Sequence, residues 1–213
     1  MPAGSAHSTF LEIYADFICP WSYIGLDRVA RLARERDVEL RWHPYLLRPD
    51  IPATGMPVSS SLPPDRLERA ETAVREAVKA AGLPWNRPDR VPNTRHAHEL
   101  GMLAETKGLS DPYYRAIFRA YFAEGQDIGD TQVLLDIGER LGMDRGEMQE
   151  AIRTGCYRAE IEMATDAAFA KGIRSVPNYV FASGKGFSGA QPYEIFLRFL
   201  DVANRRDLLQ EVA

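Results

Sequence analysis

The spacing of hydrophobic residues changes twice near the start of the chain, from strand-like to helix-like and back. Residues 10–15 are rich in aromatic and β-branched side chains, which predicts a buried strand. From Ile24 onward the apolar positions recur with a helical period, and over residues 38–43 they alternate with polar ones. Strand, helix and strand in this order predict a βαβ unit whose two strands are parallel.

A helical region follows, after a proline-rich connection. Residues 45–64 predict a long loop that leads from the sheet into the helices. Between residues 65 and 172 the hydrophobic pattern is helical and has no fixed-period repeat, which predicts a helical bundle. The expected helix starts are marked by capping residues, namely Asn93 or Thr94, Asp111, Asp130 or Thr131, and Asp144.

The strand pattern returns near the C-terminus. Residues 178–182 predict a strand, residues 183–186 a hairpin turn, and Phe187 the start of a short partner strand. Pro192 then opens the last helix. The order βαβ, helices, ββα predicts an α/β chain with a thioredoxin-like fold. Residues 8–62 and 173–213 would form the thioredoxin-like domain, with a large all-helical insertion of residues 63–172 between its halves.

Composition and charge narrow the classes of function. The 213 residues carry a formal net charge of −4, which argues against binding to nucleic acid or to an anionic membrane surface. No apolar run is long enough to span a membrane, and residues 1–9 lack the features of a secretory signal. Because Cys19 and Cys156 are the two cysteines, we expect no disulfide scaffold, no metal site and a cytoplasmic location.

Cys19 is the strongest candidate for a reactive side chain. It follows the first predicted strand and precedes Pro20, which suits the first position of a helix. Free N–H groups at a helix N-terminus favour an anion, so we expect a thiolate there. Ser22 lies one turn later, where its hydroxyl can donate to the sulfur. The alternatives are that Cys19 is a small buried apolar residue and that Ser22 bonds only to water.

Other residues are candidates for the surroundings of this thiol. Trp21 and Tyr23 would form an apolar wall for a substrate, or pack in the core. His98, with Asn93, would face a cleft as a proton donor or acceptor, or make a structural hydrogen bond. Asp16 would modulate the proton affinity of the thiol if it is buried nearby, or else cap the helix or pair with a basic residue.

Two positions far along the chain complete the set of candidates. Val176-Pro177 precedes the predicted third strand, where the thioredoxin fold holds a cis-proline against the active-site sulfur, so we expect a cis bond there. Cys156 is expected to pack within a helix. It could resolve a disulfide on Cys19 only if the two Cα atoms come within about 7 Å.

The stretch around Cys19, Asp16-Phe17-Ile18-Cys19-Pro20-Trp21-Ser22-Tyr23-Ile24-Gly25, resembles the active-site segment of FrnE-like members of the DsbA family. That superfamily also contains 2-hydroxychromene-2-carboxylate isomerases and kappa-class glutathione transferases. The resemblance continues in order over most of residues 10–200. Its further segments are Arg48-Pro49-Asp50 with Gly55, Asn93-Thr94 with Ala97-His98, Tyr121-Phe122 with Glu124-Gly125 and Asp127-Ile128, Gly172-Ile173, Val176-Pro177, and Ser188-Gly189-Ala190-Gln191.

The chain departs from the family pattern at two places. FrnE-like proteins usually carry a second cysteine where this chain has Ser22, so Cys19 cannot close a disulfide within its own motif. In the glutathione-dependent relatives a Ser-Asp pair helps to bind glutathione. The corresponding stretch here is Gly189-Ala190-Gln191, which lacks the acid and leaves Gln191 and backbone amides for that role.

The resemblance implies an enzyme, first a DsbA/FrnE-like oxidoreductase that acts by thiol–disulfide exchange through Cys19. The alternatives are an isomerase or transferase dependent on glutathione or another small thiol, and a non-catalytic thioredoxin-fold binding module. The implied partners are a small-molecule substrate or thiol, or a protein disulfide, with no tightly bound cofactor; a homodimer remains an alternative to a monomer. The implied catalytic residues are Cys19 and Ser22, and the implied substrate-binding residues are Pro20, Trp21, Tyr23, Asn93, His98, Val176, Pro177, Gly189, Ala190 and Gln191.

Overall fold

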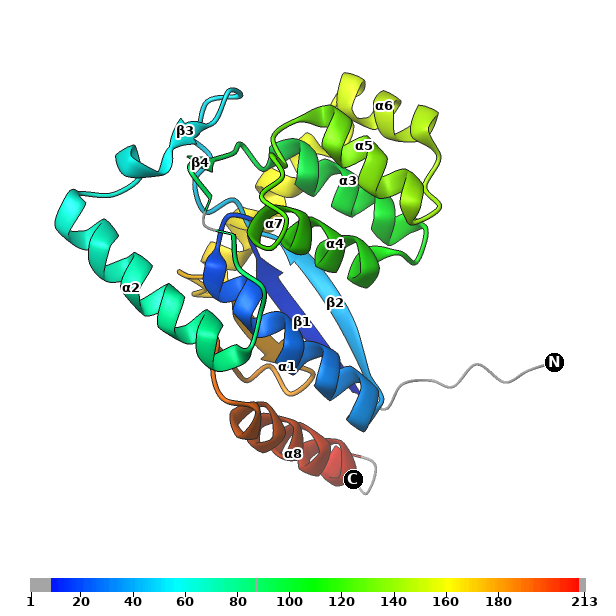
Figure 1. Ribbon diagram of the computed structural model, residues 1–213. Coiled ribbons are helices and arrows are strands. Elements are labelled where there is room, and N and C mark those ends of the chain that lie inside the picture. The colour runs from blue at the N-terminus through cyan, green and yellow to red at the C-terminus, as the bar shows by residue number, and fades with distance from the viewer. Residues whose placement is uncertain (1–8, 87, 211–213) are drawn as a thin grey trace.

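The computed structural model describes residues 9–86 and 88–210, with the side chains of 205–210 excepted. Residues 1–8 and 211–213, which include both outer ends of the predicted thioredoxin-like domain, lie outside the described residues. The chain begins with β1 (Thr9–Ala15), α1 (Pro20–Arg36) and β2 (Val38–Pro44). The two strands are parallel, with Ile13 opposite Trp42, as the βαβ pattern predicts (Figure 1).

The C-terminal segment completes the sheet. It consists of β5 (Asn178–Phe181), β6 (Gly186–Ser188) and α8 (Tyr193–Gln210). The strand order is β2-β1-β5-β6, so β1 lies in the interior, parallel to β2 and antiparallel to β5. α8 packs on the sheet through Phe196, whose ring meets Tyr179 edge-on, and it also contacts α1. The first and last segments of the chain therefore build one sheet.

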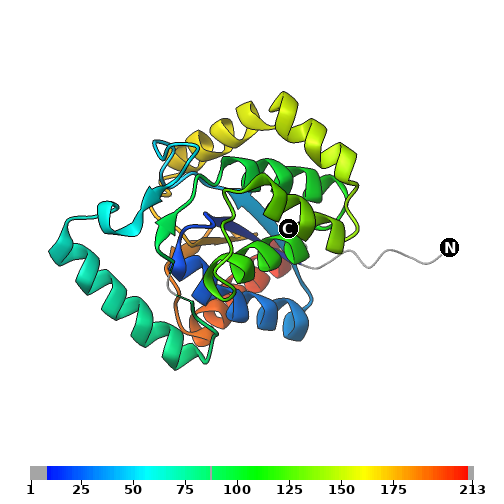
Figure 2. The same cartoon turned by 45° about the horizontal axis from the view of Figure 1, so that its top comes forward.

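The middle of the chain is mostly helical, as predicted. Figures 1 and 2 show α3 to α6 gathered above one end of the sheet, whereas α2 lies apart from that group, along α1. The helices are α2 (Pro64–Ala81), α3 (Arg95–Thr106), α4 (Ser110–Phe122), α5 (Thr131–Arg140), α6 (Arg145–Thr154) and α7 (Arg158–Ala170).

The helical insertion contains one short strand that the sequence pattern does not predict. β4 (Arg90–Val91) lies between α2 and α3 and pairs with β3 (Met56–Pro57) of the proline-rich loop. A single 3₁₀ turn, Val58–Ser60, follows β3. The loop after β2 is therefore tied to the segment before α3.

The predicted caps are mostly confirmed. Asp130 and Asp144 accept hydrogen bonds from the N–H groups of Gln132 and Glu147 at the starts of α5 and α6. Asp111 does not cap α4, because the helix already begins at Ser110. Its carboxylate instead accepts from the ring N–H of Trp42 and from Arg115.

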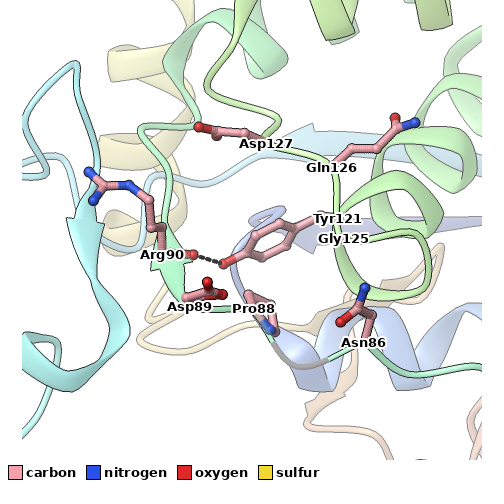
Figure 3. A pocket seen from close by; sticks show the side chains of 8 residues that line it. All are labelled: Asn86, Pro88, Asp89, Arg90, Tyr121, Gly125, Gln126 and Asp127. Atoms are coloured by element: carbon pink, nitrogen blue, oxygen red, sulfur yellow. Dashed lines mark hydrogen bonds between the residues drawn. The ribbon is translucent and has the colours of Figure 1, made fainter.

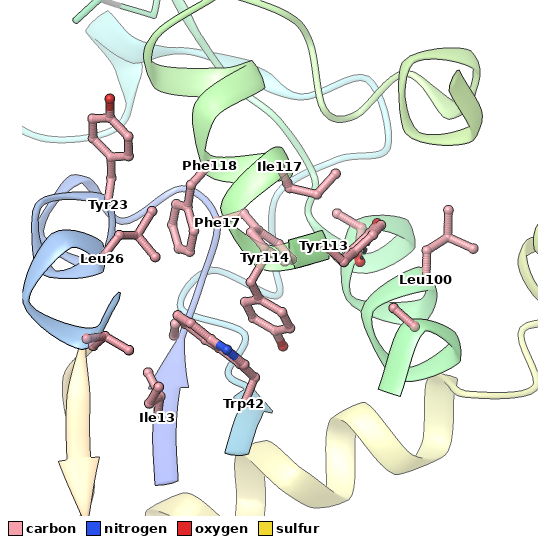
Figure 4. Packing of buried hydrophobic residues seen from close by; sticks show 14 of the residues in the cluster. Ile13, Phe17, Tyr23, Leu26, Trp42, Leu100, Tyr113, Tyr114, Ile117 and Phe118 are labelled. Carbon is pink, nitrogen blue, oxygen red and sulfur yellow. Dashed lines mark hydrogen bonds between the residues drawn. The ribbon is translucent and has the colours of Figure 1, made fainter. Parts of the chain in front are cut away.

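The sheet and the helical insertion share one hydrophobic core. Phe17, in the turn after β1, contacts Tyr114 and Phe118 of α4, with ring centroids 4.8 and 5.2 Å apart. Trp42 of β2 stacks on Tyr114 at 4.6 Å (Figure 4). A continuous cluster of buried side chains runs from β1 and β2 through α3 and α4 to Met148 of α6. The segment around Cys19, between β1 and α1, therefore sits between the sheet and this bundle.

Candidate active site around Cys19

The backbone places Cys19 at the N-terminus of α1. Its N–H donates to the carbonyl of Asp16 at 3.0 Å, which closes a tight turn after β1. Cys19 itself is extended, with φ −87° and ψ 111°, and Pro20 occupies the first helical position. Proline fits there because the first N–H of a helix has no partner within the helix. This is the strand–cysteine–helix junction that the sequence predicts.

The sulfur of Cys19 contacts the segment before β5. It donates a hydrogen bond to the carbonyl of Val176 at 3.2 Å, and the Val176–Pro177 peptide bond is cis. Cys19 is only 4% exposed and packs with Tyr45 and Ile173. The fold therefore brings together two of the predicted elements, the thiol and the 176–177 peptide.

Burial dominates the ionisation of this thiol. It raises the pKa of Cys19 above its ordinary value, because a buried thiolate loses its hydration. The Ser22 hydroxyl and the backbone N–H groups of Ser22 and Trp21 act in the opposite direction, and the charge of Asp16 adds to the rise. Burial therefore opposes the thiolate that the helix N-terminus is expected to favour. Ser22 is also buried, and its hydroxyl finds no hydrogen-bond partner of ordinary geometry among the described residues.

Asp16, whose charge acts on the thiol, forms a buried pair with His98. The Nε2 atom of His98 lies 3.4 Å from a carboxylate oxygen of Asp16, and both side chains are almost completely buried. The other oxygen accepts from the N–H of Leu47 at 2.7 Å. The His98 ring lies against Phe17, with centroids 4.6 Å apart, so it does not face a cleft. Of the two roles expected for His98, the structural hydrogen bond fits this position.

Asn93 and Tyr23 also have structural positions. The Asn93 side chain accepts from the N–H of Arg95 and donates to the carbonyl of Ile51, so it holds the start of α3. Tyr23 is buried, and its hydroxyl donates to the carbonyl of Pro84 at 2.8 Å. Trp21, in contrast, is partly exposed, with 36% of its surface accessible.

The loop of residues 188–191 supports the cis-proline. The N–H of Gly189 donates to the carbonyl of Pro177 at 2.9 Å. The amide of Gln191 donates to the carbonyl of Ser188 at 3.1 Å, within the same loop. Ala190 packs against the buried cluster of Ile24, Val74 and Val78. The three residues expected to bind substrate are therefore close to the Val176–Pro177 peptide, but they are engaged in contacts with other parts of the protein.

A pocket that the sequence did not locate lies next to the segment around Cys19. It has a volume of about 410 Å³ and is lined by Ile18 and Pro20, the two neighbours of Cys19. Further walls come from Leu47, α2, Trp85 and Phe122. The walls come from five separate segments of the chain, and among these the proline-rich loop was the only one that the sequence marked as unusual.

A second hollow lies on the other side of residues 88–91 and has a polar lining (Figure 3). Its volume is about 350 Å³, and Asp89, Arg90 and Asp127 are among the lining residues. The Tyr121 hydroxyl donates to the carbonyl of Arg90 at 2.7 Å across it. Pro88 and Tyr121 also border the pocket beside Cys19, so the two hollows are neighbours.

Cys156 lies in the turn between α6 and α7 and is exposed, so the prediction of a packed helical cysteine is wrong. Both cysteines are free thiols. Among the described residues, no group of three or more His, Cys, Asp and Glu side chains could hold a metal ion. The described helices include none that is long and apolar enough to cross a membrane.

The chain is similar to DsbA-like proteins both in sequence and in structure. The family model of the DSBA-like thioredoxin domain matches residues 10–201. The uncharacterized protein YwbO of Bacillus subtilis is 27% identical over 173 residues, which cover 80% of this chain and 85% of that protein. A probable DsbA oxidoreductase from Streptomyces coelicolor has a TM-score of 0.81 and 26% identity, covering 92% of this chain and 89% of that chain.

Two more distant structures share the fold. A 2-hydroxychromene-2-carboxylate isomerase has a TM-score of 0.74 at 19% identity and covers 95% of this chain and 98% of its own. The cytosolic disulfide reductase DsbM of Pseudomonas aeruginosa, solved with glutathione, has a TM-score of 0.67 at 20% identity, covering 90% and 98%. The predicted thioredoxin-like fold is thereby confirmed.

Proposed function

The chain belongs to the DSBA-like thioredoxin domain family, whose members are enzymes, and we propose that it catalyses thiol–disulfide exchange through the single sulfur of Cys19. One observation carries this proposal. The Cys19 sulfur lies at the N-terminus of α1 and 3.2 Å from the carbonyl of Val176, next to the cis-proline. An inert buried cysteine has no need of a helix N-terminus with N–H groups directed at its sulfur.

The reaction follows from the contacts of the sulfur. A disulfide R–S–S–R′ docks beside residues 176–177, and the thiol leaves the Val176 carbonyl and loses its proton. The Cys19 thiolate attacks one sulfur, a Cys19–S–S–R bond forms, and R′–S⁻ departs and takes up a proton. Ser22, which has no other partner of ordinary geometry in the described chain, stabilises the thiolate by donating its hydroxyl proton.

The second half of the reaction needs a thiol from outside the motif. Ser22 cannot form a disulfide with Cys19, and Cys156 lies in an exposed turn of the helical insertion. A second thiol R″–SH therefore attacks the mixed disulfide, releases R–S–S–R″ and regenerates Cys19. The catalyst ends in the state in which it began, and no net oxidation of the protein takes place. A thiol of low molecular weight is the class of partner required, and a protein disulfide is a further substrate class.

The test uses the Cys156→Ser variant, so that Cys19 is the sole thiol. The folded variant is treated with hydroxyethyl disulfide and its intact mass is measured, before and after addition of mercaptoethanol. We expect one adduct that the thiol removes, and none in a chain that also carries Cys19→Ser. If the folded variant forms no adduct while the same chain unfolded in urea does, Cys19 is not an exchange site.

A small-thiol-dependent isomerase is the second candidate, and the apolar pocket next to Cys19 favours it. Such a pocket suits a small substrate better than an open surface does. The fold neighbour that isomerises 2-hydroxychromene-2-carboxylate supplies a substrate to try. A change in its absorption spectrum that requires both the protein and glutathione would support this candidate. An unchanged spectrum would leave exchange as the activity.

A further inference from the structure

The pocket beside Cys19 indicates which disulfides react there. We propose that the exchange partner of Cys19 carries an apolar body with one acidic group, and that glutathione is a poor partner. This inference rests on the proposed function, because it names the substrate class of the same sulfur. Three observations carry it, namely the lining of the pocket, the occupied loop of residues 188–191, and one unpaired arginine at the pocket.

The pocket meets the chain on both sides of the reactive residue. Ile18 and Pro20 line it, so a molecule bound there lies against the peptide units that flank Cys19. Its volume of about 410 Å³ falls within the range of small-molecule sites, roughly 300–1,000 Å³. The walls are mostly aliphatic and aromatic, including Leu47, Val74 and Trp85. Glutathione would place two peptide groups and several charges against these walls, which costs free energy unless each is hydrogen-bonded.

The loop that would have to recognise glutathione has few groups to offer. The N–H of Gly189 is bonded to the carbonyl of Pro177, and the amide of Gln191 to the carbonyl of Ser188. The Ala190 side chain is directed into the cluster of Ile24, Val74 and Val78. Residues 188–191 also include no carboxylate that could bind an ammonium group. Polar recognition of a γ-glutamyl group is therefore missing from this loop.

The charged residues that line the pocket favour a ligand with an acidic group. Arg48 and Arg75 both line it, but both oxygens of Asp50 already bind the Arg48 guanidinium at 2.8 Å. Arg75 lies on α2 next to the buried Val74, and within the described residues it has neither a hydrogen bond nor an ion pair. Glu71, the acidic residue of the lining, is itself engaged in an interaction. Among the described residues of the lining, Arg75 is therefore the cationic group available to a ligand carboxylate.

The experiment compares three disulfides with the Cys156→Ser variant. Dithiobis(nitrobenzoate) is aromatic and acidic, dithiodipyridine is aromatic and neutral, and oxidised glutathione is polar. Each rate with the folded chain is divided by the rate with the same chain in urea, which cancels the different leaving groups. We expect the ratio to fall from the acidic aromatic reagent to the neutral one, and to be lowest for glutathione.

The outcomes separate this inference from the proposed function. If glutathione gives a ratio equal to or above those of both aromatic reagents, the inference is overturned while exchange at Cys19 stands. If the folded chain reacts with none of the three, the proposed function fails as well.

Two variants locate the selectivity in the pocket. Arg75→Gln should lower the rate ratio for dithiobis(nitrobenzoate) by about two- to fivefold, which is the effect expected from the loss of an exposed ion pair. The rate ratio for dithiodipyridine should not change. The matched control is Arg69→Gln, an exposed position of the same helix outside the lining. Ala70→Trp fills the pocket and should lower both aromatic ratios but not that of glutathione. Equal effects of Arg75→Gln and Arg69→Gln would overturn the assignment of the acidic group.

Discussion

At the scale of single residues, Cys19 combines a position that favours a thiolate with burial that opposes one. Because burial raises the pKa of Cys19, its reaction with iodoacetamide should accelerate with a midpoint above that of a free thiol, about 8.5. The measurement is the alkylation rate against pH in the Cys156→Ser variant. A midpoint below the free-thiol value would show that the helix N-terminus outweighs burial.

Two neighbours of Cys19 should move this midpoint in opposite directions. Asp16→Asn removes a negative charge that opposes ionisation, so the pKa of Cys19 should fall. Ser22→Ala removes a donor to the thiolate, so the pKa should rise. Each variant is the control of the other, because a general loosening of the fold would move both midpoints the same way. Equal shifts of one sign would refute this account.

Ser22→Cys tests whether the site still supports dithiol chemistry. Residues 19 and 22 face each other across the first turn of α1, within the separation that a disulfide requires. This variant should reduce insulin, measured as the onset of turbidity, whereas the parent should not. Failure would mean that the surroundings of the thiol have diverged together with its partner.

At the scale of elements, the close packing of α1 on β5 depends on Gly25. A Cβ atom at this position would overlap the hydroxyl of Tyr179. Gly25→Ala should therefore destabilise the fold by about 1–3 kcal/mol, as overpacking does. Urea unfolding measures the loss. Adding Tyr179→Phe, which removes the overlapping oxygen, should recover part of it, and a purely additive double variant would contradict this explanation.

The elements show how far the sequence predicts this structure. The four strands of the main sheet, the caps at Asp130 and Asp144 and the place of Cys19 follow from local patterns, because each depends on residues close together in the chain. β3 and β4 are two residues each and contain no alternation that could reveal them. Likewise, the Asp16–His98 pair joins residues far apart in sequence. The burial of His98 depends on how α3 packs on Phe17.

The candidate site was predictable only where it depends on residues close together in the chain. The motif located the thiol, but its burial arises from Val176, Tyr45 and Ile173, which three-dimensional packing brings together. Tyr23 is buried whereas Trp21 is exposed. The burial of Tyr23 depends on its contacts with Pro84 and Phe122, which follow α2 in the sequence. The pocket is assembled from several segments, and of these only the proline-rich loop stood out in the sequence.

At the scale of the whole molecule, one core serves both predicted domains. Because Trp42 of the sheet stacks on Tyr114 of the insertion, the two parts should not unfold separately. Urea unfolding curves from tryptophan fluorescence and from far-ultraviolet circular dichroism should coincide. Two separate transitions would show that residues 63–172 are an independent domain.

The interior position of β1 also has a consequence for synthesis. β1 and β2 leave the ribosome early, but β5, which pairs with the other edge of β1, is translated only after the whole helical insertion. Until then the nascent chain presents an unpaired edge of its central strand, a surface on which other chains can aggregate. A chaperone that shields emerging segments would therefore act on this protein late in translation, when the bundle is already formed and the sheet still lacks its second half.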